Sequence, residues 1–329
     1  MPEGPVLKAW AHRLHRQIST GKGLVKARFI FYPRCFAMGT SKKDYVTCTA
    51  EQDEGYDSAM DLVEDDRPVH GVPTHMDRER SRNKPWEYLL ESRATGEFVA
   101  GVLGKVLAVA AGHHLVFINF GLEANVMRVS SEDYALLANP SQDVPGPNKN
   151  KGKAQKMRSF AIPDKFKATG SSKPGELRRL NIFLAIPCSD DTVWLFVDHV
   201  RLIRFHVFSC GIPWSAKDVQ PQSKVWQHAW GDKYGLDWFG QRSYAHYQGL
   251  LDLLNQWRLK LCAQIAEGSA LTSCVLDVIS EDMAFFNGFG KHTAMDLLHE
   301  LRMLPHMPVS QLIANDVFLI DFRTTYFVL

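Results

Sequence analysis

The 329-residue sequence lacks several patterns that assign a chain to a common class. It contains no H-E-x-x-H, G-x-S-x-G or G-x-G-x-x-G motif, and no stretch approaches the roughly 18 consecutive apolar residues of a membrane span, so we expect no membrane association. The cysteines form no C-x-x-C pair and fit no common zinc spacing, which predicts free thiols in a reducing compartment. They are Cys35, Cys48, Cys188, Cys210, Cys262 and Cys274. The first residues carry no basic segment followed by an apolar run, so we expect no secretory signal and a nuclear location, with the cytoplasm as the alternative.

Charge of one sign is not in excess either, because 38 basic residues face 36 acidic ones and the net charge is +2. Any charge that binds nucleic acid therefore has to be local. Residues 51–66 hold eight acidic side chains and no basic one, and we interpret residues 38–95 as a disordered insertion that acts as a solvated tether. A segment that binds a protein partner is the alternative. Residues 148–158 hold five basic side chains and no acidic one. We interpret them as a flexible linker, with an arm that follows phosphates as the alternative.

The hydrophobic pattern predicts an α+β protein whose two halves differ in their periodicity. A leading helix is predicted just after the start of the chain, because apolar residues recur every four positions and Pro5 suits a first helical turn. Apolar runs then predict strands, with a hairpin at Gly112. From residue 247 the spacing becomes helical, and Gly268 ends a long helix. The leading helix rests on Val6, Trp10, Leu14 and Ile18, and the strands on 102–109, 115–120, 126–129, 182–186, 193–197 and 203–208.

These patterns give a domain organisation. Residues 1–212 form an N-terminal, mainly β domain with the leading helix, and they include the acidic insertion. Residues 213–240, rich in proline and glycine, form a linker. Residues 241–310 form an all-helical domain, and residues 311–329 form a tail of unknown role that has the pattern of an apolar strand.

Pro2 and Glu3 are candidates for chemistry at the start of the chain. Removal of Met1 would leave Pro2 with a free secondary amine, whose pKa of about 7.7–8.0 keeps a useful fraction neutral at physiological pH. A neutral amine can attack a sugar carbon and form a Schiff base, and Glu3 could act as the general acid. Many proteins begin Met-Pro without such a role, so the pair alone decides nothing.

Three motifs in a fixed order strengthen this hypothesis. The chain begins Met1-Pro2-Glu3-Gly4-Pro5, continues with Leu103-Gly104-Lys105-Val106-Leu107 before a strand that ends at Phe120-Gly121-Leu122, and carries an aromatic Gly-x-Gly loop between Asp282 and Gly290 ahead of a helix. Together they resemble the formamidopyrimidine-DNA glycosylase and endonuclease VIII family. The resemblance implies that the N-terminal domain is a β-sandwich and that the helical domain contains a helix–two-turn–helix segment. The resemblance covers about two thirds of the sequence and leaves out the acidic insertion.

The resemblance implies a role for each matching residue. Pro2 would be the nucleophile at C1′ of the damaged nucleotide, Glu3 would protonate the sugar oxygen, and Lys105 would contact the phosphate or base beside the lesion. Leu122 would fill the gap that the extruded base leaves. Gly288, Gly290 and Lys291 would bind DNA, because backbone N–H groups at a helix start suit a phosphate. For Lys105, Leu122 and the loop, an ordinary strand-end lysine, a core leucine and a helix connector are the alternatives.

The implied function is base-excision repair: a bifunctional DNA glycosylase and apurinic-site lyase that acts as a monomer on damaged DNA, whether duplex, bubble or single-stranded. No cofactor is implied. Lys291 stands where the family has asparagine, Met295-Asp296 stands where it has Asn-Glu, and the family's terminal zinc finger has no counterpart, so we expect no metal. These departures favour the alternative, a catalytically impaired relative that binds damaged or single-stranded DNA.

Overall fold

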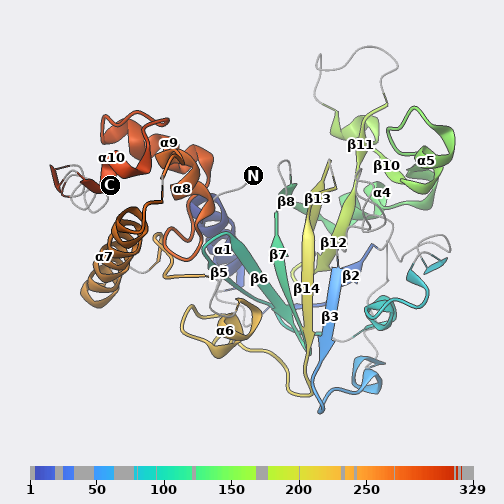
Figure 1. Ribbon diagram of the computed structural model, residues 1–329. Coiled ribbons are helices and arrows are strands. Elements are labelled where there is room, and N and C mark those ends of the chain that lie inside the picture. Colours follow the sequence, from blue (N-terminus) through green and yellow to red (C-terminus); the bar gives the residue numbers. More distant parts are fainter. Residues whose placement is uncertain are drawn as a thin grey trace. The chain divides into compact units, whose positions relative to one another are not determined.

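The computed structural model describes residues 4–18, 25–32, 48–62, 78–79, 81–93, 95–120, 124–167, 177–199, 201–230, 234–240, 243–269, 271–314, 316–317 and 320. Two compact units make up the chain. The first comprises residues 1–2, 10–101 and 107–219, and the second comprises residues 3–9, 102–106 and 220–329. Both strands and helices are present, so the protein is α+β as the sequence predicts (Figure 1).

The first unit contains two large sheets. One has the order β2–β12–β13–β8 and the other the order β3–β14–β7–β6–β5. Strand β12 pairs antiparallel with β13 and β2, β13 with β8, and β14 with β7, whereas β3 pairs with β14 in parallel. The strands are β2 Ile30–Phe31, β3 Cys48–Gln52, β5 Val99–Leu103, β6 Val106–Ala111, β7 His114–Asn119, β8 Ala124–Ser130, β12 Ile182–Pro187, β13 Thr192–Asp198 and β14 Arg204–Ser209. The predicted strands at 182–186, 193–197 and 203–208 are confirmed.

Aromatic side chains pack between the two large sheets. Phe31 and Phe183 contact Phe205 edge to face, with ring centroids 6.3 and 6.4 Å apart. Phe120 contacts Phe196 at 6.3 Å. Such pairs add to the apolar burial that holds sheets face to face. The predicted β-sandwich therefore describes this unit.

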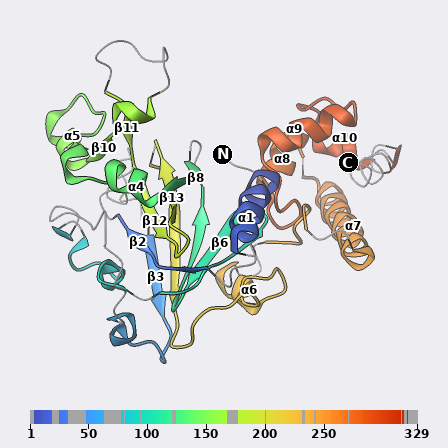
Figure 2. The ribbon, with the colours of Figure 1, turned by 180° about the vertical axis from the view of Figure 1, so that it is seen from behind.

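Smaller elements complete the first unit. A short sheet has the order β11–β10–β9, and β1 pairs with β4. Figures 1 and 2 show α5 beside β10. These elements are β1 Lys26–Ala27, β4 Gly96–Glu97, β9 Asp143–Val144, β10 Ser159–Ala161, β11 Arg179–Leu180, the helices α4 Ser131–Leu137 and α5 Lys151–Lys156, and the 3-10 turns Ser58–Leu62, Glu87–Leu90, Pro140–Gln142 and Asp164–Phe166.

The leading helix α1, Gly4–Ile18, is confirmed, but its buried face differs from the prediction. Leu7, Ala11 and Leu14 are buried, whereas Val6 is 45% exposed. The buried residues follow i, i+4, i+7 spacing, which defines one helical face as well as the predicted spacing does. The pattern of Val6, Trp10 and Leu14 identified the helix but not its side.

The apolar run at 102–109 is not one strand. A turn at Gly104 and Lys105 divides it into β5 and β6. Gly104 has φ of +55°, in the left-handed region that favours glycine. The next turn, at Gly112, lies where the sequence predicts a hairpin and has φ of +58°.

The expected disorder of residues 38–95 is wrong for part of this range. Residues 48–52 form β3, whose five residues pair in parallel with β14. Asp53 accepts hydrogen bonds from the amides of Gly55 and Gly211, and Trp86 and Leu89 are buried. Residues 38–47 and 63–77 lie outside the described residues. A strand with few apolar residues is stable here because its partner is a buried strand distant in sequence.

The second unit is helical apart from the 102–106 segment. Its helices α7 Tyr244–Ala266, α8 Val275–Glu281, α9 Lys291–Glu300 and α10 Val309–Ala314 enclose one core, and α6 spans Lys224–Trp230. The core includes Leu250, Leu254, Trp257, Phe286, Leu297 and Leu298. The helix that Gly268 ends is confirmed, and Gly268 has φ of +85°.

Two boundaries differ from the prediction. Residues 220–240 belong to the second unit: Trp226 and Trp238 are buried, and the Trp238 amide donates to the carbonyl of Asn287. Residues 311–314 continue α10, with Leu312 and Ile313 in the core. Position 317 lies in a helical turn, and residues 318–319 and 321–329 lie outside the described part. No helix among the described residues has the length and apolar character needed to cross a membrane.

Candidate nucleic-acid site in the second unit

The predicted site residues fall into two groups. Pro2, Glu3 and Leu122 lie outside the described residues. Lys105, Gly288, Gly290 and Lys291 are described, and all four belong to the second unit. The first described residue, Gly4, also belongs to this unit.

Gly4 links the start of the chain to the aromatic loop. Its amide donates a hydrogen bond to the carbonyl of Gly288, with an N···O distance of 3.2 Å. A Cβ on Gly4 would lie 2.8 Å from the ring of Phe239, 3.0 Å from the Gly288 carbonyl and 3.4 Å from the Gly104 carbonyl. Only glycine fits at this closeness. Gly4, Gly104 and Gly288 each belong to a different one of the three sequence motifs. Parts of all three motifs therefore lie close together.

The Gly104–Lys105 turn contacts the same loop. A Cβ on Gly104 would lie 1.9 Å from Oδ1 of Asn287, so this backbone tolerates no side chain. The Lys105 ammonium donates to the carbonyl of Ser280, at 3.2 Å and half-buried. Lys105 therefore extends from the turn to the end of α8, and its position is set by a glycine that the sequence places beside it.

Aromatic rings hold the loop between α8 and α9. Phe286 stacks on Trp238 with ring centroids 5.7 Å apart and meets Trp257 edge to face at 5.0 Å. Phe289 contacts Phe239 at 5.1 Å. These buried rings fix the backbone between them by apolar burial and ring contacts. The glycine at 288 has φ of +104°, and a Cβ there would lie 2.7 Å from Phe239.

Asp237 and Lys8 form an ion pair beside this loop that the sequence motifs do not include. The Lys8 ammonium lies 3.1 Å from Oδ2 of Asp237, whose side chain is 2% exposed. Oδ1 of Asp237 accepts from the Phe239 amide at 3.0 Å. Burial lowers the pKa of Lys8, and the Asp237 carboxylate partly offsets that effect. A lysine on α1 is thereby tied to the segment that precedes α7.

Gly290 is the N-cap of α9 and has no side chain that could accept a hydrogen bond from the first turn of the helix, an arrangement that suits a phosphate. Lys291 follows and is 63% exposed. Its ammonium lies 3.3 Å from Asp277 and 4.0 Å from Glu281, both on α8. The Cys274 thiol donates a hydrogen bond to Asp277 at 3.0 Å. This bond, and secondarily Lys291, hold the pKa of the Asp277 carboxyl below its usual value.

Sequence reasoning missed the groups that support the site. Asn287 is fully buried, and its Nδ2 donates to the Gly235 carbonyl at 2.9 Å. Its Oδ1 accepts no hydrogen bond within the described residues. Nothing near Lys8 or Asp237 in sequence indicates their pairing, because the two residues are far apart along the chain. Only the run of glycines and aromatics between 285 and 290 gave a signal.

Among the described residues no group of three or more histidine, cysteine or acidic side chains is placed to hold a metal ion. His199, His206 and Cys210 are near one another in sequence, but His206 bonds Thr49 at 2.6 Å and contacts Glu51 at 3.2 Å instead.

No protein-family model matches the sequence, and no curated protein matches it. Solved structures align with it at low identity. One is Lactococcus lactis formamidopyrimidine-DNA glycosylase non-covalently bound to DNA with an abasic site, at 10% identity and a TM-score of 0.39, covering 70% of this chain and 61% of that chain.

Two further structures cover more of the chain. A complex of the L. lactis enzyme with tetrahydrofuran-containing DNA and an inhibitor has 11% identity and a TM-score of 0.48, covering 99% of this chain and 76% of that chain. The wild-type L. lactis enzyme with DNA containing an oxidised pyrimidine has 11% identity and a TM-score of 0.47, covering 99% and 77%.

Proposed function

We propose that this protein is a DNA glycosylase with apurinic-site lyase activity that removes oxidised bases. One observation carries the proposal. The residue that follows Pro2 and Glu3 bonds the carbonyl of Gly288, and the Gly104–Lys105 turn packs on Asn287 of the same loop. Parts of the three motifs that resemble one enzyme family are therefore in contact within the second unit, and this contact supports the proposal.

The proposed chemistry belongs to Pro2. Its neutral amine attacks C1′ of the damaged nucleotide, the glycosidic bond breaks, and the base leaves with the bonding electrons. Glu3 protonates the sugar ring oxygen, so the ring opens to an iminium on Pro2. Loss of a proton from C2′ then expels the 3′ phosphate by elimination. Water hydrolyses the imine and frees the amine.

The proposed DNA contacts belong to lysines and backbone amides. Lys105 and Lys291 supply positive charge, and the N-terminus of α9, whose N-cap Gly290 has no side chain, suits a phosphate oxygen. Leu122 would fill the space that an extruded base vacates, since extrusion costs a few kcal/mol. Damaged DNA as partner, a monomeric state and a nuclear location complete the proposal.

Trapping tests this function. The protein, with its mature N-terminus confirmed by mass spectrometry, is mixed with an abasic-site duplex and borohydride, which reduces an imine to a stable adduct. We expect an adduct from the wild type and from Pro5→Ala, the matched control at an exposed proline three residues away. A variant with one added N-terminal residue places the Pro2 nitrogen in a peptide bond and should give none. Equal trapping by that variant would refute Pro2 as the nucleophile.

A second candidate is a relative that binds damaged or single-stranded DNA without catalysis. The observation that favours it is Lys291, which replaces the family's asparagine and pairs with Asp277. In that case DNA binding would be steeply salt-dependent, because lysines release counterions from DNA, yet no imine would form. Binding without trapping by the wild type would select this candidate.

A further inference from the structure

The basic charge of this protein is concentrated in one segment of the first unit. Residues 149–179 hold ten basic and two acidic side chains, so this segment carries a formal charge of +8 while the rest of the chain carries −6. The described part of the segment includes α5 and β10 and ends at β11. A near-neutral chain therefore hides a strongly basic surface element, and the question is what it binds.

This segment is not the flexible linker that the sequence suggested. Asn150 caps α5, its side chain accepting from the Lys153 amide at 3.0 Å, and Ala154 is buried. The Gly146 amide donates to the Ala154 carbonyl at 2.8 Å. A Cβ on Gly146 would lie 1.9 Å from the Met157 carbonyl, so the chain before the helix packs directly on its end. The helix is a fixed part of the fold.

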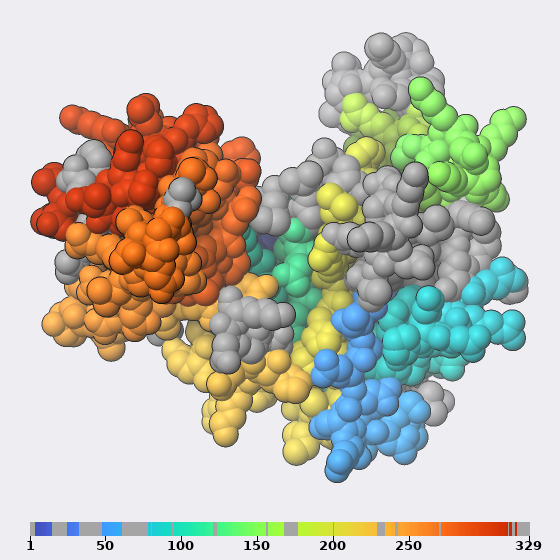
Figure 3. Space-filling model, viewed as in Figure 1, coloured from blue at the N-terminus to red at the C-terminus, as the bar shows by residue number. Residues whose placement is uncertain are grey.

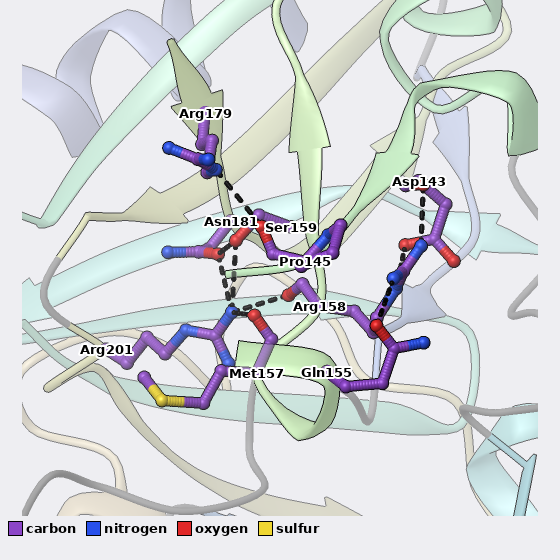
Figure 4. A network of polar contacts seen from close by, with 9 residues as sticks. All are labelled: Asp143, Pro145, Gln155, Met157, Arg158, Ser159, Arg179, Asn181 and Arg201. Carbon is purple, nitrogen blue, oxygen red and sulfur yellow. Dashed lines mark hydrogen bonds and ion pairs between the residues drawn. The ribbon is translucent and has the colours of Figure 1, made fainter. Parts of the chain in front are cut away.

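A buried polar network holds the end of the helix (Figure 4). Arg201 is 2% exposed, and its guanidinium donates to the Met157 and Arg158 carbonyls and to the Asn181 side chain. Asn181 in turn accepts from the Ser159 hydroxyl at 2.7 Å. These bonds join α5 to β10 and to the segment before β12. Such a network rigidifies what it connects, because each buried group depends on its partner.

Several basic residues of the segment are used within the fold. Arg158 bonds the Asp143 carboxylate at 2.9 Å and its carbonyl at 2.6 Å, and Arg179 donates to the Pro145 carbonyl at 3.1 Å. Lys165 pairs with Asp133 and Lys167 with Asp164. These residues have structural partners, which separates them from the lysines at the start of α5.

Lys149, Lys151 and Lys153 have no such partners. All three are exposed, and none contacts a carboxylate in the part of the chain that the structure describes. The first turn of α5 contains no acidic residue. Figure 3 shows the side chains around residue 150, in bright green, standing out from the surface.

Lysines at the start of α5 lower the stability of this helix. Cations at a helix N-terminus oppose the helix dipole. Gly152, between Lys151 and Lys153, weakens the helix, and a Cβ added there would lie 3.4 Å from the Asn150 side chain, an ordinary contact distance, so packing does not require a glycine at this position. Features that cost stability locally indicate a function at that site.

We propose that Lys149, Lys151 and Lys153 form a phosphate-binding surface for nucleic acid, separate from the residues discussed for catalysis. The inference rests on the proposed function for its partner, DNA. Between the lysines lie Asn150, which is small and polar, and Gly152, which has no side chain. A nucleic-acid backbone can therefore approach closely. No exposed apolar residue lies among them to enter a lipid surface, which argues against a membrane. Phosphate contacts of this kind position a protein on DNA without reading sequence.

The test compares salt dependence of binding to a lesion-free 40-base-pair duplex. K149Q/K151Q/K153Q is compared with K26Q/K84Q/K217Q, which removes the same charge from three exposed lysines elsewhere in the unit. Each phosphate contact contributes about 0.9 to the slope of log affinity against log salt. A rise from 50 to 200 mM salt should therefore weaken the wild type about 40-fold more than the α5 variant. K149R/K151R/K153R should keep the wild-type slope.

The outcomes separate this inference from the proposed catalysis. Equal slopes for the wild type and the α5 variant, or an equal loss in the control, would overturn the inference even if imine trapping succeeds. A slope that depends on the α5 lysines would support it even if trapping fails. Binding of the α5 lysines to phosphatidylserine vesicles or to polyglutamate as tightly as to DNA of matched charge would assign the surface to another partner and overturn it.

Discussion

Gly104→Ala perturbs the contact between the Lys105 turn and the aromatic loop most directly. The left-handed φ of +55° costs an alanine about 1–2 kcal/mol. The new methyl would lie 1.9 Å from Oδ1 of Asn287, and moving this side chain breaks its buried bond to the Gly235 carbonyl, at about 1–3 kcal/mol. The expected loss of unfolding free energy is therefore about 2–5 kcal/mol.

Gly268→Ala is the matched control. Gly268 is also left-handed, at φ of +85°, but nothing lies within 4 Å of its Cβ position, so it should show the backbone cost alone. Guanidinium unfolding followed by tryptophan fluorescence measures both variants. Asn287→Ala should recover part of the loss in a double variant, because the clash is then removed. The packing argument is refuted if Gly104→Ala costs no more than Gly268→Ala.

Three further predictions follow from the described contacts. Asp237→Ala should destabilise the protein by about 2–3 kcal/mol in guanidinium unfolding, because it removes the carboxylate that binds the half-buried Lys8 ammonium and the Phe239 amide. Lys8→Met should cost less, and equal costs for the two variants would contradict the pairing. Asp277→Asn should tighten DNA binding and steepen its salt slope by up to about 0.9 in fluorescence anisotropy, because it removes the carboxylate that lies nearer to Lys291 than Glu281 does. Asp296→Asn, which removes an exposed charge on the same helix as Lys291, should change the affinity less, and no difference between the two variants would count against Lys291 as a phosphate ligand. Burial, and secondarily Asp53, raise the pKa of the Cys210 thiol to about 12. At pH 8.5 iodoacetamide should therefore modify the exposed Cys262 about tenfold or more faster than Cys210, as measured by peptide mass spectrometry, and equal rates would contradict the raised pKa.

The sequence predicted elements whose signals are local. Helices α7 and α9 were predictable because apolar residues repeat on one face, and Gly268 marks an end. The turn at Gly104 was hidden inside an apolar run, since β5 and β6 are both rich in valine and alanine. Strand β3 was missed because it has few apolar residues and is formed by pairing with β14, about 150 residues later.

The candidate site divides in the same way. The structure explains why glycine occupies positions 104 and 288: both residues have a positive φ, and neither has space for a side chain. Lys291 is predicted and exposed, but its pairing with Asp277 depends on how α8 packs on α9. Asp237 and Lys8 could not be found from sequence, because an ion pair between distant segments leaves no local pattern.

The most direct test of the central claim is to identify which amine bonds to DNA. The borohydride-reduced adduct with an abasic-site oligonucleotide is digested, and the cross-linked peptide is sequenced by mass spectrometry. The account predicts an adduct on the peptide that begins at Pro2. Lys8 is the competing amine, because burial lowers its pKa. An adduct on Lys8 or on another lysine, or no adduct at all, would contradict the assignment of Pro2 as the nucleophile.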